Sequence, residues 1–236
     1  MRGIRTSAPV TAYQDEAAIN AYSVYRLFPE EIHLFSKYYR PGDRIADLGC
    51  GLGRTTLRLH EMGCLVTGVD LSKPFIELAS RRFPDIDFHH SSFTHTRLPS
   101  ADFDHVLISF NSLDDAYPES ERELALAEAG RLLKLGGTLL FSSHNLRSIL
   151  LSPKYSTVSM NLWRLRHYVK AFGEKAYIYD RWNRCDLFYT TSGYARRQTE
   201  RHGFDFVERV GLRASQSTFV AEWLSPHIHY LFRKHV

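Results

Sequence analysis

The stretch that decides the fold is Arg44–Ser72, RIADLGCGLGRTTLRLHEMGCLVTGVDLS. It opens with an apolar run and then places glycines at three alternate positions, Gly49, Gly51 and Gly53. An amphipathic run over residues 54–62 and a second apolar run over 65–69 follow before Asp70. This order is typical of a strand, a tight glycine turn, a helix and a second strand. We therefore expect one βαβ unit of about 30 residues.

Each part of this unit suits the binding of a nucleoside. Glycine lets the backbone turn sharply and approach a ligand with no Cβ in the way. The helix that begins after Gly53 offers unpaired N–H groups at its N-terminus. The carboxylate of Asp70, at the tip of the second strand, can accept both hydroxyls of a ribose. We expect the unit to hold a nucleoside-containing cofactor.

The glycine spacing separates two classes of cofactor. Dinucleotide folds use G-x-G-x-x-G with a pyrophosphate at the helix end, but here the third glycine comes one residue earlier. Asp47 lies two residues before Gly49, where its carboxylate would repel a pyrophosphate and suit a cationic amino-acid group. The stretch resembles motif I of the class I S-adenosylmethionine (SAM) methyltransferases, D-x-G-C-G-x-G. The spacing disfavours a nicotinamide dehydrogenase.

The resemblance implies a Rossmann-like α/β fold of the class I methyltransferase type. Such a fold has a seven-stranded, mostly parallel sheet with an antiparallel last strand and helices on both faces. Residues 217–223 and 227–233 are both strand-like, and one of them should be the last strand. We expect an N-terminal helical cap at residues 1–40, the SAM-binding core at 41–145, an aromatic-rich lid insertion at 146–190, and the C-terminal helix and last strands at 191–236.

The same resemblance implies a set of cofactor contacts. After the third strand the family usually has an acid that bonds the adenine amino group, and this chain has Ser92-Phe93 there. The serine hydroxyl can still accept a hydrogen bond, and the ring can pack on adenine. Cys50 is expected to be a small residue under the cofactor rather than a nucleophile. The predicted contacts to SAM, and to its product S-adenosylhomocysteine, are Asp47, Gly49, Cys50, Gly51, Gly53, Asp70, Leu71, Ser92, Phe93 and Asn111.

Two polar clusters follow the fourth and fifth expected strands, at residues 111–115 and 142–145. In open α/β sheets, ligands bind outside the carboxyl ends of the strands. An oxygen or protonated-amine acceptor must lose a proton, and histidine titrates near neutral pH, which suits a general base. We therefore predict His144 and Asp114 as catalytic residues. A hydrogen-bonded structural histidine and a loop or helix-cap carboxylate remain the alternatives.

Residues 146–190 depart from the α/β alternation and are rich in aromatic side chains. The family inserts lids and acceptor-binding elements after the fifth strand, so an aromatic lid over a small organic acceptor is the interpretation. A homodimer interface, which uses the same kinds of residue, is the alternative. The predicted substrate contacts are Tyr25, Asn145, Arg181 and Tyr189.

Composition excludes several classes of protein. The 236 residues are 44% hydrophobic and 24% charged, as in ordinary globular domains. No run of about 18 apolar residues and no secretory signal are seen, so neither a membrane span nor export is expected. Three cysteines cannot all pair, which indicates reduced thiols and a cytoplasmic location. The net charge of +4 is not concentrated enough to predict nucleic-acid binding, and no histidine pair has a third metal ligand nearby.

The predicted activity is therefore transfer of the SAM methyl group, by in-line displacement, to an O or N atom of a small organic acceptor. NSLDDA replaces the D/N-P-P-Y/F motif of amino-methylating DNA or glutamine methyltransferases, and no Pro-Cys pair for cytosine C5 chemistry is present. Two alternatives stay open: a methyltransferase acting on RNA or protein, and a SAM-binding protein without catalysis. Salt-sensitive binding to nucleic acid would favour the first of these.

Overall fold

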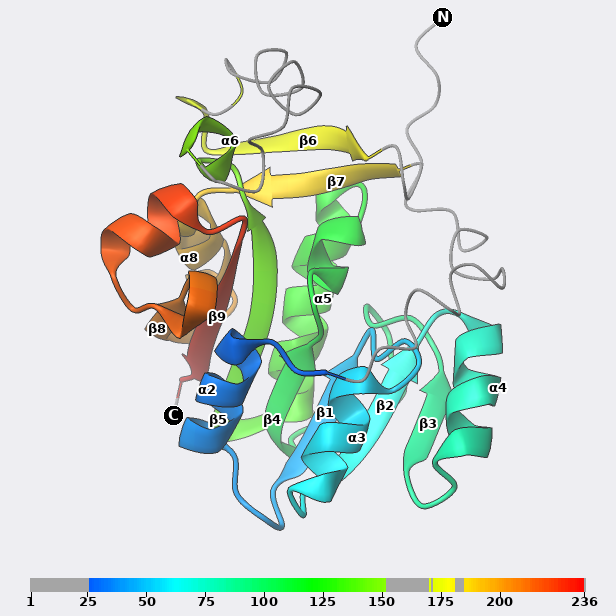
Figure 1. The fold of residues 1–236 in the computed structure, drawn as a ribbon. Coiled ribbons are helices and arrows are strands. Elements are labelled where there is room, and N and C mark those ends of the chain that lie inside the picture. The colour runs from blue at the N-terminus through cyan, green and yellow to red at the C-terminus, as the bar shows by residue number, and fades with distance from the viewer. Residues whose placement is uncertain (1–25, 152–169, 171, 181–184, 236) are drawn as a thin grey trace, which may run out of the picture.

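The computed structural model describes residues 26–151, 170, 172–180 and 185–235. A mixed β-sheet runs through its centre, with helices on both faces (Figure 1). Its main strands are β1 (Arg44–Leu48), β2 (Leu65–Asp70), β3 (Asp87–His90), β4 (Phe103–Ile108), β5 (Leu133–Asn145), β8 (Phe204–Val210) and β9 (His227–Lys234). The order β3-β2-β1-β4-β5 is parallel throughout. Strand β9 then pairs antiparallel with both β5 and β8.

The helices begin where the sequence lets them begin. They are α2 (Pro29–Tyr38), α3 (Arg54–Glu61), α4 (Lys73–Arg82), α5 (Glu119–Leu132), α6 (Ser148–Leu151) and α8 (Ser192–Glu200), with short turns η2 (Ser112–Asp115), η5 (Leu212–Ala214) and η6 (Val220–Leu224). Pro29 and Pro74 stand in the first turns of α2 and α4, where a missing N–H costs nothing. Residues 217–223, one of the two strand-like runs, overlap η6, so the antiparallel last strand is β9.

Alternate residues of the central strands enter two separate cores. Ile45 and Leu107 pack with Leu34 on the face covered by α2 and α3. Ala46 and Val106 pack with α5 and α8 on the other face (Figure 1). Burial of a side chain of leucine or isoleucine size contributes about 1.5–3 kcal/mol. The sheet is therefore a rigid support for the loops at its carboxyl edge.

Two further strands extend the sheet beyond the prediction. Strands β6 (Lys175–Asp180) and β7 (Cys185–Thr190) form an antiparallel hairpin, which lies across the tip of β5 (Figure 1). Tyr189 and Thr190 pair there with His144 and Asn145. Within the described residues the sheet thus has nine strands, and the predicted number of seven was wrong. The hairpin falls in the segment that we interpreted as a lid, whose aromatic composition obscured its period of two.

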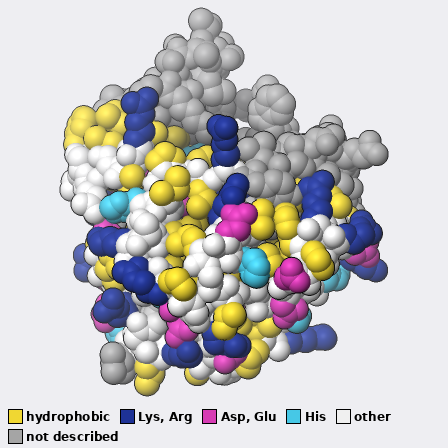
Figure 2. Space-filling view, turned by 60° about the horizontal axis from the view of Figure 1, so that its bottom comes forward, with side chains coloured by type: hydrophobic (Ala, Val, Ile, Leu, Met, Phe, Trp, Pro, Cys, Tyr) yellow, Lys and Arg dark blue, Asp and Glu magenta, His cyan; other side chains and the backbone are white. Residues whose placement is uncertain are grey.

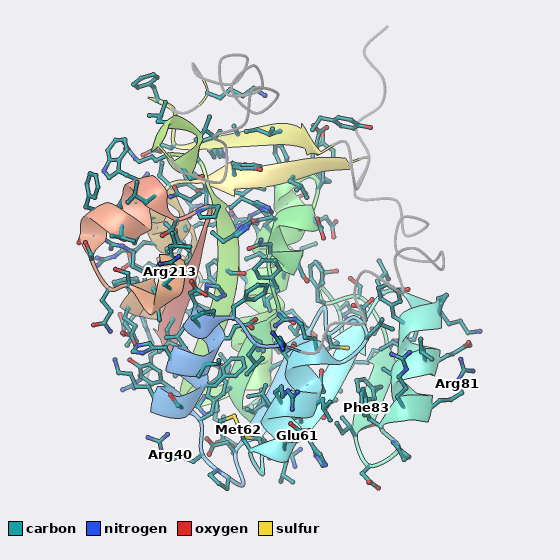
Figure 3. The ribbon with its side chains drawn as sticks, in the orientation of Figure 1. Arg40, Glu61, Met62, Arg81, Phe83 and Arg213 are labelled. Atoms are coloured by element: carbon teal, nitrogen blue, oxygen red, sulfur yellow. The ribbon has the colours of Figure 1, made fainter. Side chains whose placement is uncertain are left out.

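Helix α2 is held to the rest of the fold by polar contacts at both ends. The backbone N–H of Arg213 on η5 donates to Glu30 at 2.7 Å, and Arg213 lies beside the upper part of α2 (Figure 3). Lys37 pairs with Glu208 of β8 at 2.9 Å. These contacts fix the segment that leads into α2, which borders the site described below.

The surface shows no concentrated basic area on the face seen in Figure 2. Lys and Arg side chains of the described residues stand there among acidic, apolar and neutral ones (Figure 2). None of the helices in the described part of the chain has the length and apolar composition needed to cross a membrane. In that same part, no group of three or more His, Cys, Asp or Glu side chains is arranged to hold a metal ion.

Candidate functional site

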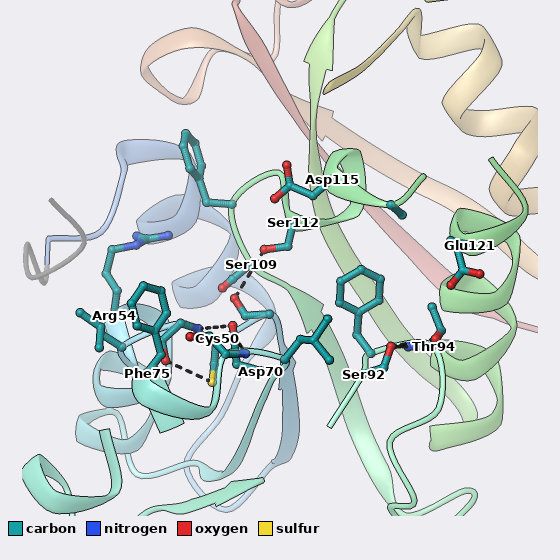
Figure 4. Close-up of a pocket in the computed structure, with 18 of the residues that line it drawn as sticks. Cys50, Arg54, Asp70, Phe75, Ser92, Thr94, Ser109, Ser112, Asp115 and Glu121 are labelled. Carbon is teal, nitrogen blue, oxygen red and sulfur yellow. Dashed lines mark hydrogen bonds between the residues drawn. The ribbon is translucent and has the colours of Figure 1, made fainter. Parts of the chain in front are cut away.

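A cavity of about 690 Å³ opens at the carboxyl edge of the sheet. The glycine turn after β1, the end of β2, the loop after β3 and the segment after β4 all contribute to its wall. Figure 4 shows Arg54 at one end, Thr94 and Glu121 at the other, and Ser112 and Asp115 across from the glycine turn. Ligand sites of open α/β sheets occupy this position.

The glycine turn needs glycine at each of its three positions. Gly49, Gly51 and Gly53 have φ of 74°, 55° and 84°, in the left-handed region that other residues avoid. A Cβ on Gly49 would also lie 2.6 Å from the Oγ of Ser112. Gly49 and Gly51 line the cavity, whereas Gly53 is the N-cap of α3 and is not among the lining residues.

Asp47 is placed behind the turn rather than in the cavity wall. Its side chain is fully buried, and it accepts hydrogen bonds from the hydroxyls of Thr55 at 2.6 Å, Thr56 at 2.7 Å and Ser109 at 3.0 Å. Burial raises the pKa of its carboxyl, and the three hydroxyl bonds oppose that rise. Asp47 thus ties the first turn of α3 to β1 and to the residue after β4, and its predicted contact to a cofactor would be indirect.

Asp70 lines the cavity at the end of β2. One carboxylate oxygen accepts the backbone N–H of Gly51 at 2.8 Å, and the other accepts that of Ser72 at 2.7 Å. Burial raises the pKa of this carboxyl, although the two backbone bonds oppose the rise. Each oxygen keeps a further lone pair, so the carboxylate can accept two hydroxyls from a ligand in the cavity.

The remaining predicted cofactor contacts divide into two groups. Cys50, Leu71, Ser92 and Phe93 line the cavity. Burial raises the pKa of the Cys50 thiol well above its usual value, which keeps it protonated and a poor nucleophile. Asn111 is not a lining residue: its side chain is buried and its Nδ2 lies 2.9 Å from Nδ1 of His227.

His144 and Asp114 form a close pair next to the cavity. The Nδ1 of His144 lies 2.7 Å from a carboxylate oxygen of Asp114, which also accepts the His144 backbone N–H at 2.6 Å. Neither residue lines the cavity. The His144 ring contacts His227 at 4.8 Å between centroids, and His227 contacts the cavity-lining ring of Phe110 at 5.1 Å.

Of the four predicted substrate contacts, the two that the structure describes, Asn145 and Tyr189, do not line the cavity. Asn145 is fully buried, and its Nδ2 donates to backbone carbonyls of residues 221, 222 and 225. That arrangement gives Asn145 a structural task, the fixing of η6. Tyr189 packs on His144 with centroids 4.8 Å apart and is not a lining residue. Tyr25 and Arg181 lie outside the described residues.

Sequence reasoning missed a group of residues at the Arg54 end of the cavity. Arg54 makes a bidentate pair with the buried Glu31 at 2.6 and 2.7 Å, and its guanidinium lies over the rings of Phe28 and Phe110. These two rings stack at 4.4 Å. The signals were the position of Arg54 directly after the glycine turn and that of Phe110 two residues after the end of the apolar strand β4.

Asp115 is the carboxylate of η2 that faces the cavity. Its neighbour Asp114 is fully buried and does not line the cavity, because successive residues of a tight turn point in different directions. The prediction chose Asp114 from two adjacent acids that sequence alone could not distinguish. Tyr117 and Glu121 complete this wall.

Residues 45–137 match the family model described as a methyltransferase domain. The chain is 37% identical over 102 residues to demethylmenaquinone methyltransferase of Renibacterium salmoninarum, covering 42% of this chain and 40% of that one. It is 34% identical over 109 residues to the ubiquinone biosynthesis O-methyltransferase of Nitrosococcus oceani, covering 44% of each. It is 30% identical over 130 residues to the eEF1A lysine and N-terminal methyltransferase of Danio rerio, covering 52% of this chain and 18% of that one. The match thus spans less than half the length of each relative.

Solved structures share the fold across nearly the whole chain. The CcbJ methyltransferase of Streptomyces caelestis superposes with a TM-score of 0.71 at 17% identity, over 98% of this chain and 100% of that one. A 1,6-didemethyltoxoflavin-N1-methyltransferase of Burkholderia thailandensis, with bound 1,6-didemethyltoxoflavin and S-adenosylhomocysteine, gives a TM-score of 0.66 at 19% identity, over 96% of this chain and 85% of that one. At sequence identities of 17% and 19%, these superpositions show a shared fold only. The family match supplies what the fold alone does not: residues 45–137 form a methyltransferase domain, which supports the prediction of a class I S-adenosylmethionine-dependent methyltransferase.

Proposed function

We propose that this protein transfers the methyl group of SAM to an O or N atom of a small organic acceptor. The observation that carries the proposal is a cavity of about 690 Å³ that joins the glycine turn and Asp70 to a wall of aromatic side chains. Small-molecule sites in proteins usually enclose about 300–1,000 Å³ and are lined mainly by apolar groups.

The residues around the glycine turn fit SAM. Asp70 lines the cavity with a carboxylate, the group that ribose hydroxyls require as acceptor. Ser92 and Phe93 also line the cavity, and we expect adenine beside them. Bound SAM supplies an activated methyl on a sulfonium leaving group, so the protein has to align the acceptor and remove its proton.

The acceptor side favours a flat organic molecule. Phe28, Phe110 and Tyr117 all contribute to the cavity lining, and aromatic walls bind planar rings by stacking. Relatives named for demethylmenaquinone and ubiquinone biosynthesis support such an acceptor. The structural neighbour that holds 1,6-didemethyltoxoflavin supports it too.

For the proton we propose His144 as general base. Asp114 holds Nδ1 at 2.7 Å, and among the described residues no hydrogen-bond partner is found for Nε2, which can therefore accept a proton. The acceptor atom attacks the methyl carbon, the C–S bond breaks with its electrons passing to sulfur, and the proton of the acceptor passes to Nε2. This requires the acceptor to reach past Phe110 and His227.

Transfer of a labelled methyl group from SAM tests the proposal. The purified protein is incubated with a metabolite extract, with tRNA and with a protein lysate, each freed of the other two, and the label is followed into each fraction. Label in the metabolite fraction is expected. Label only in tRNA or protein, or SAM binding without transfer to any fraction, would contradict it, and the similarity to the eEF1A lysine methyltransferase makes the protein fraction the main rival.

The base is tested by a matched pair of variants, His144→Asn and Asp115→Asn. Transfer is expected to fall by about 100-fold in His144→Asn with SAM affinity unchanged. Asp115→Asn should cost much less, since it alters the cavity wall and leaves His144 in place. The reverse order would assign the base to Asp115.

A further inference from the structure

A buried set of charged side chains lies behind His144, away from the cavity. Arg122 on α5 and Asp114 on η2 are both fully buried. An Nη1 of Arg122 lies 2.9 Å from one Asp114 oxygen, and Nδ1 of His144 lies 2.7 Å from the other. Imidazole, carboxylate and guanidinium therefore follow one another in a row from the strand tip to the helix.

The hydrogen bonds around Asp114 determine which atom carries the proton. Asp114 accepts from Arg122, from the backbone N–H of His144 at 2.6 Å and from the hydroxyl of Ser143 at 2.7 Å. A carboxylate that accepts from this many donors acts as an ion, and it leaves Nδ1 of His144 only the role of donor. The neutral ring then has its lone pair on Nε2.

Arg122 is the group that makes an ion tolerable in this position. A buried carboxylate is costly unless a cation and further donors accompany it. Arg122 also donates to the carbonyl of Leu113 at 2.6 Å, and its guanidinium lies 4.1 Å from the ring centroid of Phe188 on β7. It thereby links α5, η2 and the β6–β7 hairpin.

We propose that Arg122 is a positioning residue, which keeps Asp114 ionised and in place so that His144 presents a bare Nε2 to the methyl acceptor. This inference rests on the proposed function for its catalytic meaning. When Nε2 accepts the proton, His144 becomes an imidazolium ion, and the negative charge of Asp114 balances its positive charge. The proton then passes from His144 to solvent.

The tautomer of His144 is the most direct readout. The full-length protein is labelled with ¹⁵N-histidine, and its ring signals are recorded at alkaline pH, where imidazoles are neutral. His144 is assigned by the signal missing in His144→Gln. The wild type is expected to show a proton on Nδ1 and none on Nε2. A proton on Nε2 would overturn the proposal without any further variant.

Two variants test Arg122 itself. Arg122→Gln should give a mixture of tautomers, and the milder Arg122→Lys a smaller admixture, because lysine lacks the planar fork of the guanidinium. Arg131→Gln is the matched control on the same helix: it removes an ion pair with Glu128 and should leave the His144 signal unchanged. A wild-type tautomer in both Arg122 variants would overturn the proposal.

Calorimetry separates this inference from the proposed function. Arg122→Lys is expected to bind SAM within about 2-fold of wild type, while methyl transfer to the acceptor found in the screen falls by about 10-fold or more. Unchanged transfer in a variant with mixed tautomers would overturn the role in catalysis. Failure of the wild type to bind SAM would instead remove the proposed function, and the tautomer result would stand separately.

Discussion

Single residues at the glycine turn determine both the backbone conformation of the turn and the affinity of the cavity for SAM. Gly49→Ala is expected to destabilise the fold, because φ is 74° and the new Cβ would lie 2.6 Å from the Oγ of Ser112. Gly136→Ala is the matched control, with the same φ of 74° and nothing within 4 Å of the added Cβ. The control should lose about 1–2 kcal/mol in the free energy of unfolding, and Gly49→Ala should lose more.

Urea unfolding measures both glycine variants, and calorimetry gives their SAM affinity. Gly49→Ala should lose affinity as well as stability, since it displaces Ser112 in the cavity wall. Equal losses in the two variants would show that the left-handed backbone alone matters and that the contact to Ser112 does not.

The raised pKa of Asp70 predicts that the affinity for SAM depends on pH. Burial raises the pKa of its carboxyl above the usual range of an aspartate, and ribose hydroxyls need the ionised form as acceptor. SAM affinity should be constant near neutral pH and fall on acidification, beginning above the pH at which an exposed aspartate titrates. Titrations at stepped pH check this, with Asp70→Asn as comparison: the variant binds weakly at every pH. A wild-type fall confined to the usual range of aspartate would contradict the raised pKa.

At the scale of elements, one ion pair joins α2 to α3. Glu31 is buried, and both its oxygens accept from Arg54. Glu31→Gln should cost about 1–3 kcal/mol of unfolding free energy, less than a fully buried pair, because Arg54 is 18% exposed. It should also weaken SAM binding through Phe28 and Arg54, which line the cavity.

Lys37→Gln is the control for this pair on the same helix. It breaks the contact to Glu208, in which the lysine side chain is 46% exposed, and such pairs contribute about 1 kcal/mol or less. SAM affinity should stay at the wild-type value. An equal effect of the two variants on SAM affinity would argue that α2 influences the cavity only through its general stability.

The loop after β3 is tied to α5 by Glu128. Burial raises the pKa of Glu128, but hydrogen bonds from Arg131 and Thr96 outweigh burial and lower this pKa from 4.5 to about 2. Because the folded value lies below the unfolded one, the stabilisation is complete above about pH 5 and is lost as the pH falls toward 2.

Chemical unfolding at pH 6 and pH 3 checks the role of Glu128. Wild type should lose more unfolding free energy between these two values than Glu128→Gln does. If both proteins lose the same amount, other carboxylates account for the acid sensitivity.

At the scale of the whole molecule, the sequence predicted the features that are formed by residues close together in the chain. The βαβ unit, the turn and the position of Asp70 in the cavity wall follow from residues that are neighbours in the chain. The hairpin β6–β7 was missed because its aromatic composition obscured its period of two, and its place beside β5 rests on a long-range contact. For the same reason no local pattern linked Arg122 to His144, although the structure places Asp114 between them.

Titration of the purified protein with SAM, with NADH as control, for wild type and Asp70→Ala, tests the central claim most directly. Wild type is expected to bind SAM saturably and not to bind NADH. The variant should lose affinity by about 10-fold or more, because two charge-assisted hydrogen bonds are missing. Absence of SAM binding, or binding indifferent to Asp70, would contradict the assignment of this cavity to SAM.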